Sequence, residues 1–215
     1  MAEPSERNDE VERSAAERLT FFTDAVAAIA LTLLALELPV PEGFSPTELV
    51  DSIGRSLSEY LAFVISFVVI AAHWSTHHDI FRWVVRVDGG LRRLNFWWLL
   101  TIVLVPFVSK LLSESGEPPP GETDTTLPLR FAVYAAVQVM ANVVFLLIVR
   151  RMASAHLVRS DTPATLLART RRAAIVLGAT FAISIPLFLV WDRAWWVWII
   201  LPTVYHLWRR FITPR

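Results

Sequence analysis

Long apolar stretches alternate along this chain with short, arginine-rich junctions, and this alternation limits the fold more than any other feature. A run of about 20 apolar residues in a helix matches the hydrocarbon core of a bilayer. A water-soluble domain would instead spread its charges along amphipathic elements. The composition, 54% hydrophobic with nine tryptophans, also suits a bilayer. The sequence therefore predicts an all-α, polytopic membrane protein.

Six stretches are long enough to cross the membrane. We expect these transmembrane helices at residues 19–38, 59–82, 92–113, 127–150, 170–191 and 193–212. The chain has no cysteine, so disulfides and cysteine-ligated metal sites are excluded. The sequence thus predicts one membrane domain of six helices.

The segments beside the first span are polar. Residues 1–17 have mixed charge, and we expect a mobile cytoplasmic tail that becomes helical near Ala15, followed by a six-helix transmembrane domain over residues 18–215. After the first span, the prolines and glycine of residues 39–43 force an extended path. Ser45 then marks the start of a short amphipathic helix that reaches Leu57.

Arginine and lysine are distributed unevenly between the two sides of this topology. An even number of spans puts both termini on one side, and that side receives sixteen of the twenty basic residues. The other four are Arg55, Lys110, Arg130 and Arg193. Because cytoplasmic loops carry excess Lys and Arg, we expect a multi-pass protein of the cell membrane with both termini in the cytoplasm. The formal net charge of zero gives no reason to expect nucleic acid as a partner.

The first span combines an apolar stripe with one acidic residue. At 100° per residue, Ile29, Leu33 and Leu36 fall within about 60° of one another with Thr32 on the flank, whereas Asp24 lies about 140° from Ile29. An aspartate in such a helix serves as an ion ligand, as a proton relay, or in a polar network between helices, and we favour the network. An isolated Ile/Leu stripe is most often a packing or lipid contact, so periodicity alone does not indicate a channel.

A sequence motif gives the stripe another meaning. Arg18, Phe22, Thr23 and Asp24 form the pattern R-x-x-x-F-T-D, which resembles the R-x-x-x-F-S-D motif of the transmembrane protein 175 family of potassium channels. Threonine in place of serine keeps the hydroxyl group. The family resemblance continues in three further regions, which are residues 28–38, 74–78 and 86–95.

The resemblance implies a homotetrameric, leak-like potassium channel whose pore is lined by four copies of the first helix. Carried over by spacing from Asp24, the pore constrictions fall at Ile29, Leu33 and Leu36, which form the apolar stripe. The resemblance also implies that the four motif residues pack away from the pore axis and bond to polar groups of other helices. Identical subunits, potassium ions and membrane lipids are the expected partners, and no cofactor is expected besides the permeant ion.

The expected selectivity mechanism differs from that of common potassium channels. The sequence contains no T-V-G-Y-G segment, so a P-loop filter of backbone carbonyls is excluded. We expect apolar rings to penalise the dehydration of sodium more than that of potassium. The Thr32 hydroxyl would replace part of the lost water nearby.

Two histidines in the second span leave a second class of function open. His73 and His77 are spaced i, i+4 on one helix face, which suits a metal or an axial haem ligand. Hydrogen bonding is the commoner use of such residues. We expect His77 or His73 to bond to Asp24 or Asn95 and thereby hold the first helix against the second and third.

A secondary transporter is a further alternative. Pro106 and Pro186 interrupt two spans, as broken transporter helices do, but the sequence has no second copy of the first-helix motif. Scattered hydroxyl residues do not form a cluster of catalytic groups, so we expect no enzyme. The arginine clusters at 82–93 and 150–172 suit anionic lipid head groups, although membrane topology explains them as well.

Overall fold

The computed structural model describes residues 4–113, 124–191 and 193–201 of this 215-residue chain. Its elements in chain order are α1 (Pro4–Leu36), α2 (Pro46–Arg55), α3 (Leu57–Phe81), α4 (Gly89–Ser113), α5 (Leu127–Ser154), α6 (Ala164–Phe188) and the 3-10 turn η1 (Ala194–Trp196). Extended pairing in the described part is limited to one isolated bridge between Val84 and Val158. The predicted all-α class is confirmed.

Five helices, α1, α3, α4, α5 and α6, are long and apolar enough to cross a membrane. They correspond to the first five predicted spans. The sixth prediction, residues 193–212, falls largely outside the described residues, which here end at residue 201. The predicted amphipathic segment is confirmed as α2, which is capped at Ser45 and ends at Arg55.

The structure differs from the predicted tail at the start of the chain. Helix α1 begins at Pro4 and continues without a break into the first span. Most residues between Ser5 and Glu17 are Glu, Arg or Ala, which favour helix, and Pro4 suits a first helical turn. The Arg86 Nε atom lies 2.8 Å from Glu12 Oε2 and fixes this extension against the loop after α3.

Helix α6 begins at Ala164, six residues before the predicted start of the fifth span. The extra turn includes Arg169, and Arg171 and Arg172 follow it on the same helix. Arginine favours helix, and its long side chain can extend the charged group to the membrane interface. The arginines before residue 173 therefore belong to the helix and do not mark its start.

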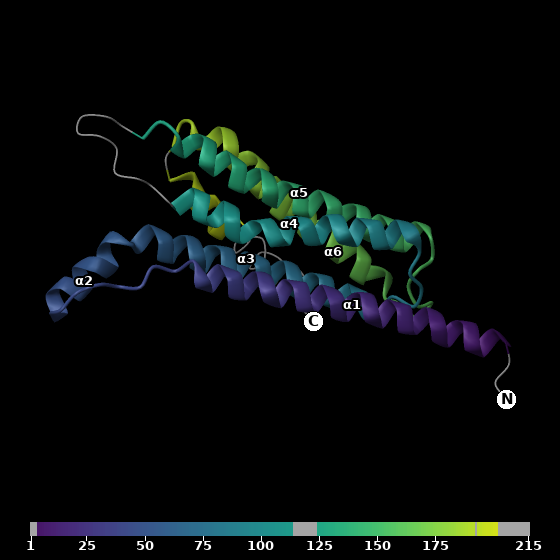
Figure 1. Cartoon of the computed structure of the whole chain (residues 1–215). Coiled ribbons are helices and arrows are strands. Elements are labelled where there is room, and N and C mark those ends of the chain that lie inside the picture. Colours follow the sequence, from purple (N-terminus) through teal and green to yellow (C-terminus); the bar gives the residue numbers. More distant parts are fainter. Residues whose placement is uncertain (1–3, 114–123, 192, 202–215) are drawn as a thin grey trace, which may run out of the picture.

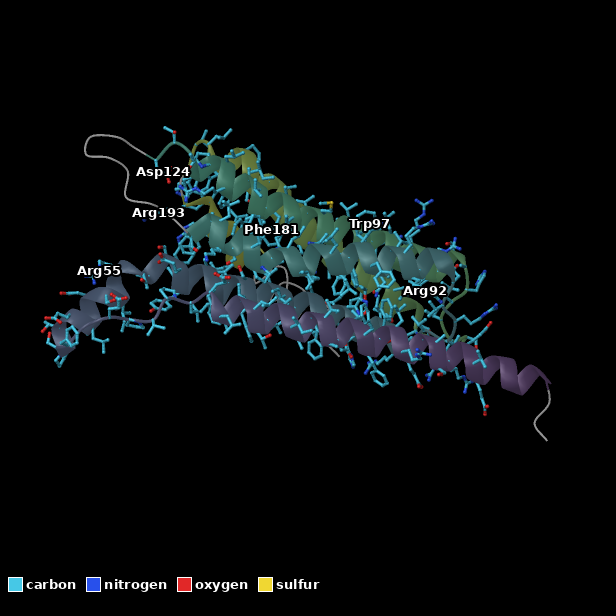
Figure 2. The ribbon with its side chains drawn as sticks, in the orientation of Figure 1. Arg55, Arg92, Trp97, Asp124, Phe181 and Arg193 are labelled. Atoms are coloured by element: carbon cyan, nitrogen blue, oxygen red, sulfur yellow. The ribbon has the colours of Figure 1, made fainter. Side chains whose placement is uncertain are left out.

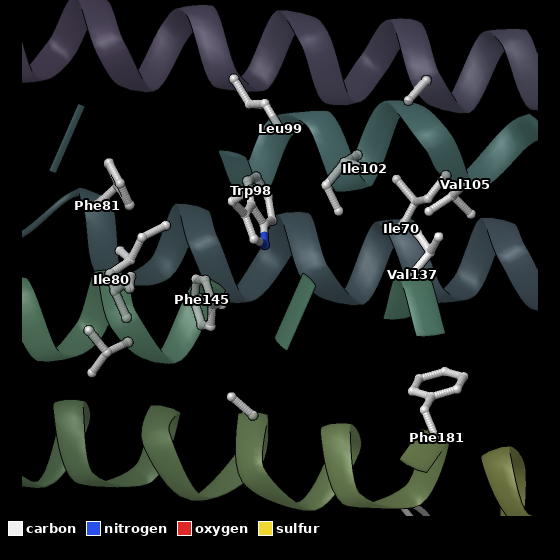
Figure 3. Close-up of a cluster of buried hydrophobic side chains, with 14 of the residues drawn as sticks. Ile70, Ile80, Phe81, Trp98, Leu99, Ile102, Val105, Val137, Phe145 and Phe181 are labelled. Carbon is white, nitrogen blue, oxygen red and sulfur yellow. The ribbon is translucent and has the colours of Figure 1, made fainter. Parts of the chain in front are cut away.

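The helices pack as a layered bundle (Figure 1). Helix α1 lies along one side, against α3 and α4, while α5 and α6 pair on the other side of α4. Figure 3 shows the core between them, where Trp98 of α4 lies near Phe145 of α5. Among the described residues, this arrangement leaves one long face of α1 without a neighbouring helix.

The two ends of the bundle carry different charged groups (Figure 2). Arg92 lies toward the end from which the N-terminal turns of α1 extend, whereas Arg55, Asp124 and Arg193 lie toward the opposite end. The fold therefore separates in space the residues that the topology prediction assigns to opposite sides of the membrane.

Candidate functional site

Helix α1 has two faces of different character. Its inner face packs on α3 and α4 through small and apolar side chains that recur every three or four residues: Ala16, Leu19, Thr23, Ala27, Ala30 and Leu34. The two central alanines bring the backbone of α1 close to its neighbours. No helix in the described part of the chain covers the opposite face.

The stripe predicted from the sequence lies on this uncovered face. Ile29, Leu33 and Leu36 are 56%, 43% and 80% exposed in the single chain. The Thr32 side chain is also exposed, and its hydroxyl donates to the Ile29 carbonyl at 2.8 Å. The oxygen lone pairs of Thr32 therefore remain free to accept. In one subunit this face is available for other subunits, for lipid, or for water and ions.

A buried hydrogen-bond chain joins three helices behind the stripe. His77 Nε2 on α3 donates to Asn95 Oδ1 on α4 at 2.8 Å, and Asn95 Nδ2 donates to Thr23 Oγ1 on α1 at 2.8 Å. The Thr23 hydroxyl in turn donates to the Leu19 carbonyl at 2.8 Å. All three side chains are fully buried. These bonds remove part of the cost of placing polar groups in the bundle, although His77 Nδ1 has no hydrogen-bond partner among the described residues.

Aromatic rings surround the histidine of this chain. The His77 ring stacks on Phe81 and on Trp98, with ring centroids 3.7 Å and 4.5 Å apart. With its ring packed and its Nε2 bonded to Asn95, His77 is positioned as a structural residue and has no room for a porphyrin. His73 is also buried, at 6.4 Å from the Trp98 ring. The structure therefore gives the haem alternative no support.

Asp24 has partners other than those expected. Its Oδ1 accepts from Trp74 Nε1 at 2.9 Å, and its Oδ2 lies 3.4 Å from His78 Nδ1, a pair that is ionic only when His78 is protonated. The structure brings Asp24 to neither His73, His77 nor Asn95. It lies between α1 and the outer side of α3, away from the exposed stripe, as the 140° offset in the helix indicates.

The other two motif residues lie differently from Thr23 and Asp24. Phe22 is half exposed and contacts the Phe96 ring edge-on, with centroids 5.8 Å apart. Arg18 is exposed and has no hydrogen bond or ion pair with any described residue. Both positions fall within about 20° of Ile29 around the helix, so they share the side of the stripe. The polar contacts with other helices that the resemblance implies for these positions are not formed among the described residues of one subunit.

Sequence reasoning missed an ion pair at the end of the stripe. Lys110 Nζ on α4 lies 2.6 Å from Glu37 Oε2, one residue after Leu36. The pair borders a cavity of about 170 Å³ between α1, α3 and α4, which Leu34, Phe63 and Ser109 also line. The sequence did contain a signal for this pair, because Glu37 and Lys110 carry opposite charges at the ends of the first and third spans that the topology places on the same side of the membrane.

A second missed contact ties α4 to α5 at the other end. Asp88 Oδ1 accepts from the Leu91 amide at 2.7 Å and caps α4, while Arg151 Nε donates to Asp88 Oδ2 at 2.9 Å. Hydrogen bonds from Arg151 and then from the Leu91 amide hold the pKa of Asp88 below its usual value. A Cβ atom at Gly90 would lie 2.9 Å from Arg151 Nε, so glycine allows this approach.

Comparison with known families identifies a match over the first half of the chain. The family described as "Endosomal/lysosomal potassium channel TMEM175" matches residues 18–106, which contain the exposed stripe and the buried chain. A protein of Streptomyces collinus that is named a potassium channel is 33% identical over 171 residues, covering 78% of this chain and 81% of that protein.

Two solved structures share the fold. A lysosomal potassium-selective channel TMEM175 homolog from Chamaesiphon minutus superposes with a TM-score of 0.73 at 25% identity, covering 90% of this chain and 97% of the other. A variant of the potassium channel MtTMEM175 superposes with a TM-score of 0.62 at 20% identity, covering 92% and 94%, and at this identity shows the fold alone.

Proposed function

Because this chain belongs to the TMEM175 family of potassium channels, we propose that four copies of it surround a pore lined by α1. The chain is a membrane-embedded subunit of a potassium-selective channel, and its family and relatives are ion channels and not enzymes. The proposal concerns the parts of that channel: the number of subunits, the helix at the axis and the residues that select the ion.

The observation that carries this proposal is the uncovered face of α1. The same helix packs on its inner side through small residues and leaves Ile29, Leu33 and Leu36 exposed. Facing a symmetry axis, these side chains form three stacked apolar rings. In a closed ring of identical subunits every α1 has the same surroundings, whereas the α1 of a single subunit lies at the edge of its bundle.

Selection in such a pore depends on the cost of removing water from an ion. Apolar rings offer no replacement ligands, so the ion with the more tightly held water is penalised more, and that ion is sodium. Thr32 lies beside the rings and donates its proton to the Ile29 carbonyl, which leaves its oxygen to face a cation. The rings would thus act as filter and gate, with the threonine oxygens as partial ligands.

The buried hydrogen-bond chain would hold the proposed pore helix in place. Hydrogen bonds from His77 through Asn95 to Thr23 hold α1 at a fixed rotation against α3 and α4. That rotation decides which residues of α1 meet the axis. We further propose a multi-pass protein of the cell membrane with both termini in the cytoplasm, potassium as the permeant ligand and no cofactor.

The proposed filter is tested by replacing one ring residue. Ile29→Asn adds a polar ligand to the pore and is expected to lower the preference for potassium over sodium several-fold, because a wetted ring no longer requires full dehydration. Reversal potentials of the purified protein in planar bilayers, under opposed potassium and sodium gradients, measure this change.

Ile183→Asn is the matched control. Ile183 is 55% exposed on α6, on the other side of the bundle from α1, and Ile29 is 56% exposed. The control should leave the reversal potential unchanged. An unchanged reversal potential in Ile29→Asn would exclude Ile29 from the filter, and equal shifts in both variants would show a general effect of asparagine in the bundle.

A further inference from the structure

An apolar groove lies between α5 and α6, at the end of the bundle where these helices are joined by the 155–163 loop. Its volume is about 660 Å³. The apolar part of the lining includes Leu146 and Leu147 on α5 and Leu167 and Ile175 on α6, and two arginines, Arg150 and Arg171, complete it. Each arginine lies one turn of helix, about 6 Å, from the apolar residues nearer the middle of the span. Leu167 lies one turn on the other side of Arg171, so the two arginines place positive charge within an otherwise mostly apolar groove.

In the described part of the chain, the two groove arginines lack the acidic partner that some others at the same end have. Three of those others form ion pairs, namely Arg86 with Glu12, Arg151 with Asp88 and Arg159 with Asp161. Arg150 and Arg171 are exposed, and neither has an acidic partner among the described residues. Arg92, Arg93 and Arg172 also lack an acidic partner among the described residues, so what sets Arg150 and Arg171 apart is that their charges line the apolar groove.

The groove also lies on two helices that, over their described residues, do not pack against the proposed pore helix. Helix α1 packs on α3 and α4, while α5 and α6 pack on each other beyond α4 (Figure 1). In a ring with α1 at the axis, the α5–α6 side faces the lipid. The sequence-based topology places this end of both helices at the cytoplasmic leaflet.

From this combination we infer that the groove binds an anionic phospholipid of the cytoplasmic leaflet. One acyl chain lies along Leu147 and Ile175, and the phosphate accepts hydrogen bonds from Arg150 and Arg171. Planar guanidinium groups suit phosphate oxygens, and two of them carry charge that a net anionic head group neutralises. A zwitterionic lipid fits less well because its own ammonium group compensates the phosphate.

Native mass spectrometry of the purified full chain tests this site with phosphatidylglycerol and phosphatidylcholine of identical acyl chains. We expect saturable retention of one phosphatidylglycerol per subunit and weaker retention of phosphatidylcholine. Arg150→Gln and Arg171→Gln should each lower retention of phosphatidylglycerol about fivefold, the usual effect of one basic residue near an anionic lipid. Ile175→Trp keeps both charges but fills the groove, and it should lower retention as well.

Arg172→Gln is the matched control, because Arg172 is exposed on the same helix but does not line the groove. It should change retention less than about twofold. Equal retention of both lipids by the unaltered protein would overturn the inference, as would equal effects of the Arg171 and Arg172 variants or no effect of Ile175→Trp. A change in subunit number with unchanged lipid retention would assign the groove to a contact between copies. Because the readout involves no ion flux, a negative result leaves the pore proposal intact.

Discussion

The Thr23 hydroxyl is a meeting point of three helices. It accepts from Asn95, which accepts from His77, and it donates to its own helix. Removing this one oxygen leaves the Asn95 amide group buried without its acceptor. The cost of such a change is about 1 kcal/mol in water-soluble proteins and often somewhat less between membrane helices.

Thr23→Val should therefore destabilise the detergent-solubilised protein by about 1 kcal/mol. The change keeps the shape of the side chain and removes only the hydroxyl. Thr76→Val is the matched control, because the Thr76 hydroxyl is exposed and donates to its own helix at Ala72. Thermal unfolding followed by tryptophan fluorescence gives the unfolding midpoint of both variants. Equal midpoints would show that the buried hydrogen-bond chain does not stabilise the bundle.

At the residue scale, the sequence predicted on which face of a helix a side chain lies better than it predicted the hydrogen-bond partner of that side chain. Helical spacing placed Asp24 away from Ile29, and the structure agrees. The partner of Asp24 depends on how α3 is rotated against α1, because Trp74, His77 and His78 all lie within five positions of one helix. Packing of the whole bundle sets that rotation, and spacing within one helix does not record it. Residue types therefore indicated the bond between His77 and Asn95, but they did not show the partners of Asp24.

Among the elements, the junction between α4 and α5 gives the clearest test. Asp88 caps α4 and pairs with Arg151 near the end of α5. Asp88→Asn keeps a capping oxygen but removes the charge, so it isolates the ion pair. Because both side chains are partly exposed, we expect a loss of under about 1 kcal/mol at neutral pH.

The pH dependence of that loss follows from the pKa of Asp88, which lies below its usual value in the folded protein. The ion pair therefore contributes fully above the unfolded pKa of about 3.9, and its contribution disappears as the pH falls through the lower, folded pKa. Unfolding midpoints of the two proteins should differ at pH 7 and converge at pH values below about 4. Asp161→Asn, which breaks an exposed pair between residues two apart, should have a smaller effect at every pH.

Helix positions were the most predictable elements, because the hydrophobic length of a span is set by the bilayer. Their ends were harder to predict where charge continues the helix. The charged residues that precede the first and fifth predicted spans are part of α1 and α6, because Glu and Arg favour helix even where they are in contact with water. The sixth predicted span lies mostly outside the described residues and stays a prediction.

For the whole molecule, the absence of cysteine provides a direct test of the proposed axis. Leu36→Cys introduces the single thiol of the chain on the face that we assign to the pore. A charged, water-soluble thiosulfonate should react with it and reduce potassium flux in liposomes, since a pore-lining side chain is in contact with water. Flux with and without the reagent measures the effect.

Ile183→Cys places the same thiol on α6, on the side that we assign to lipid, and should not respond to the reagent. In addition, thiols at a four-fold axis can pair between subunits, so mild oxidation of Leu36→Cys should give linked chains on denaturing gels. Reaction at Ile183→Cys with none at Leu36→Cys would reverse the assignment of the two sides and end the proposal.

The 33 residues of α1 measure about 50 Å as a helix, whereas the hydrocarbon core is about 30 Å thick. The helix thus projects roughly 20 Å beyond the bilayer core, and between Ser5 and Leu38 the sequence has neither glycine nor proline to introduce a hinge. In the proposed channel, these N-terminal turns are rigidly continuous with the residues that face the pore. If Ile29, Leu33 and Leu36 form the filter as we propose, a molecule that moves the N-terminal turns would tilt these side chains with them.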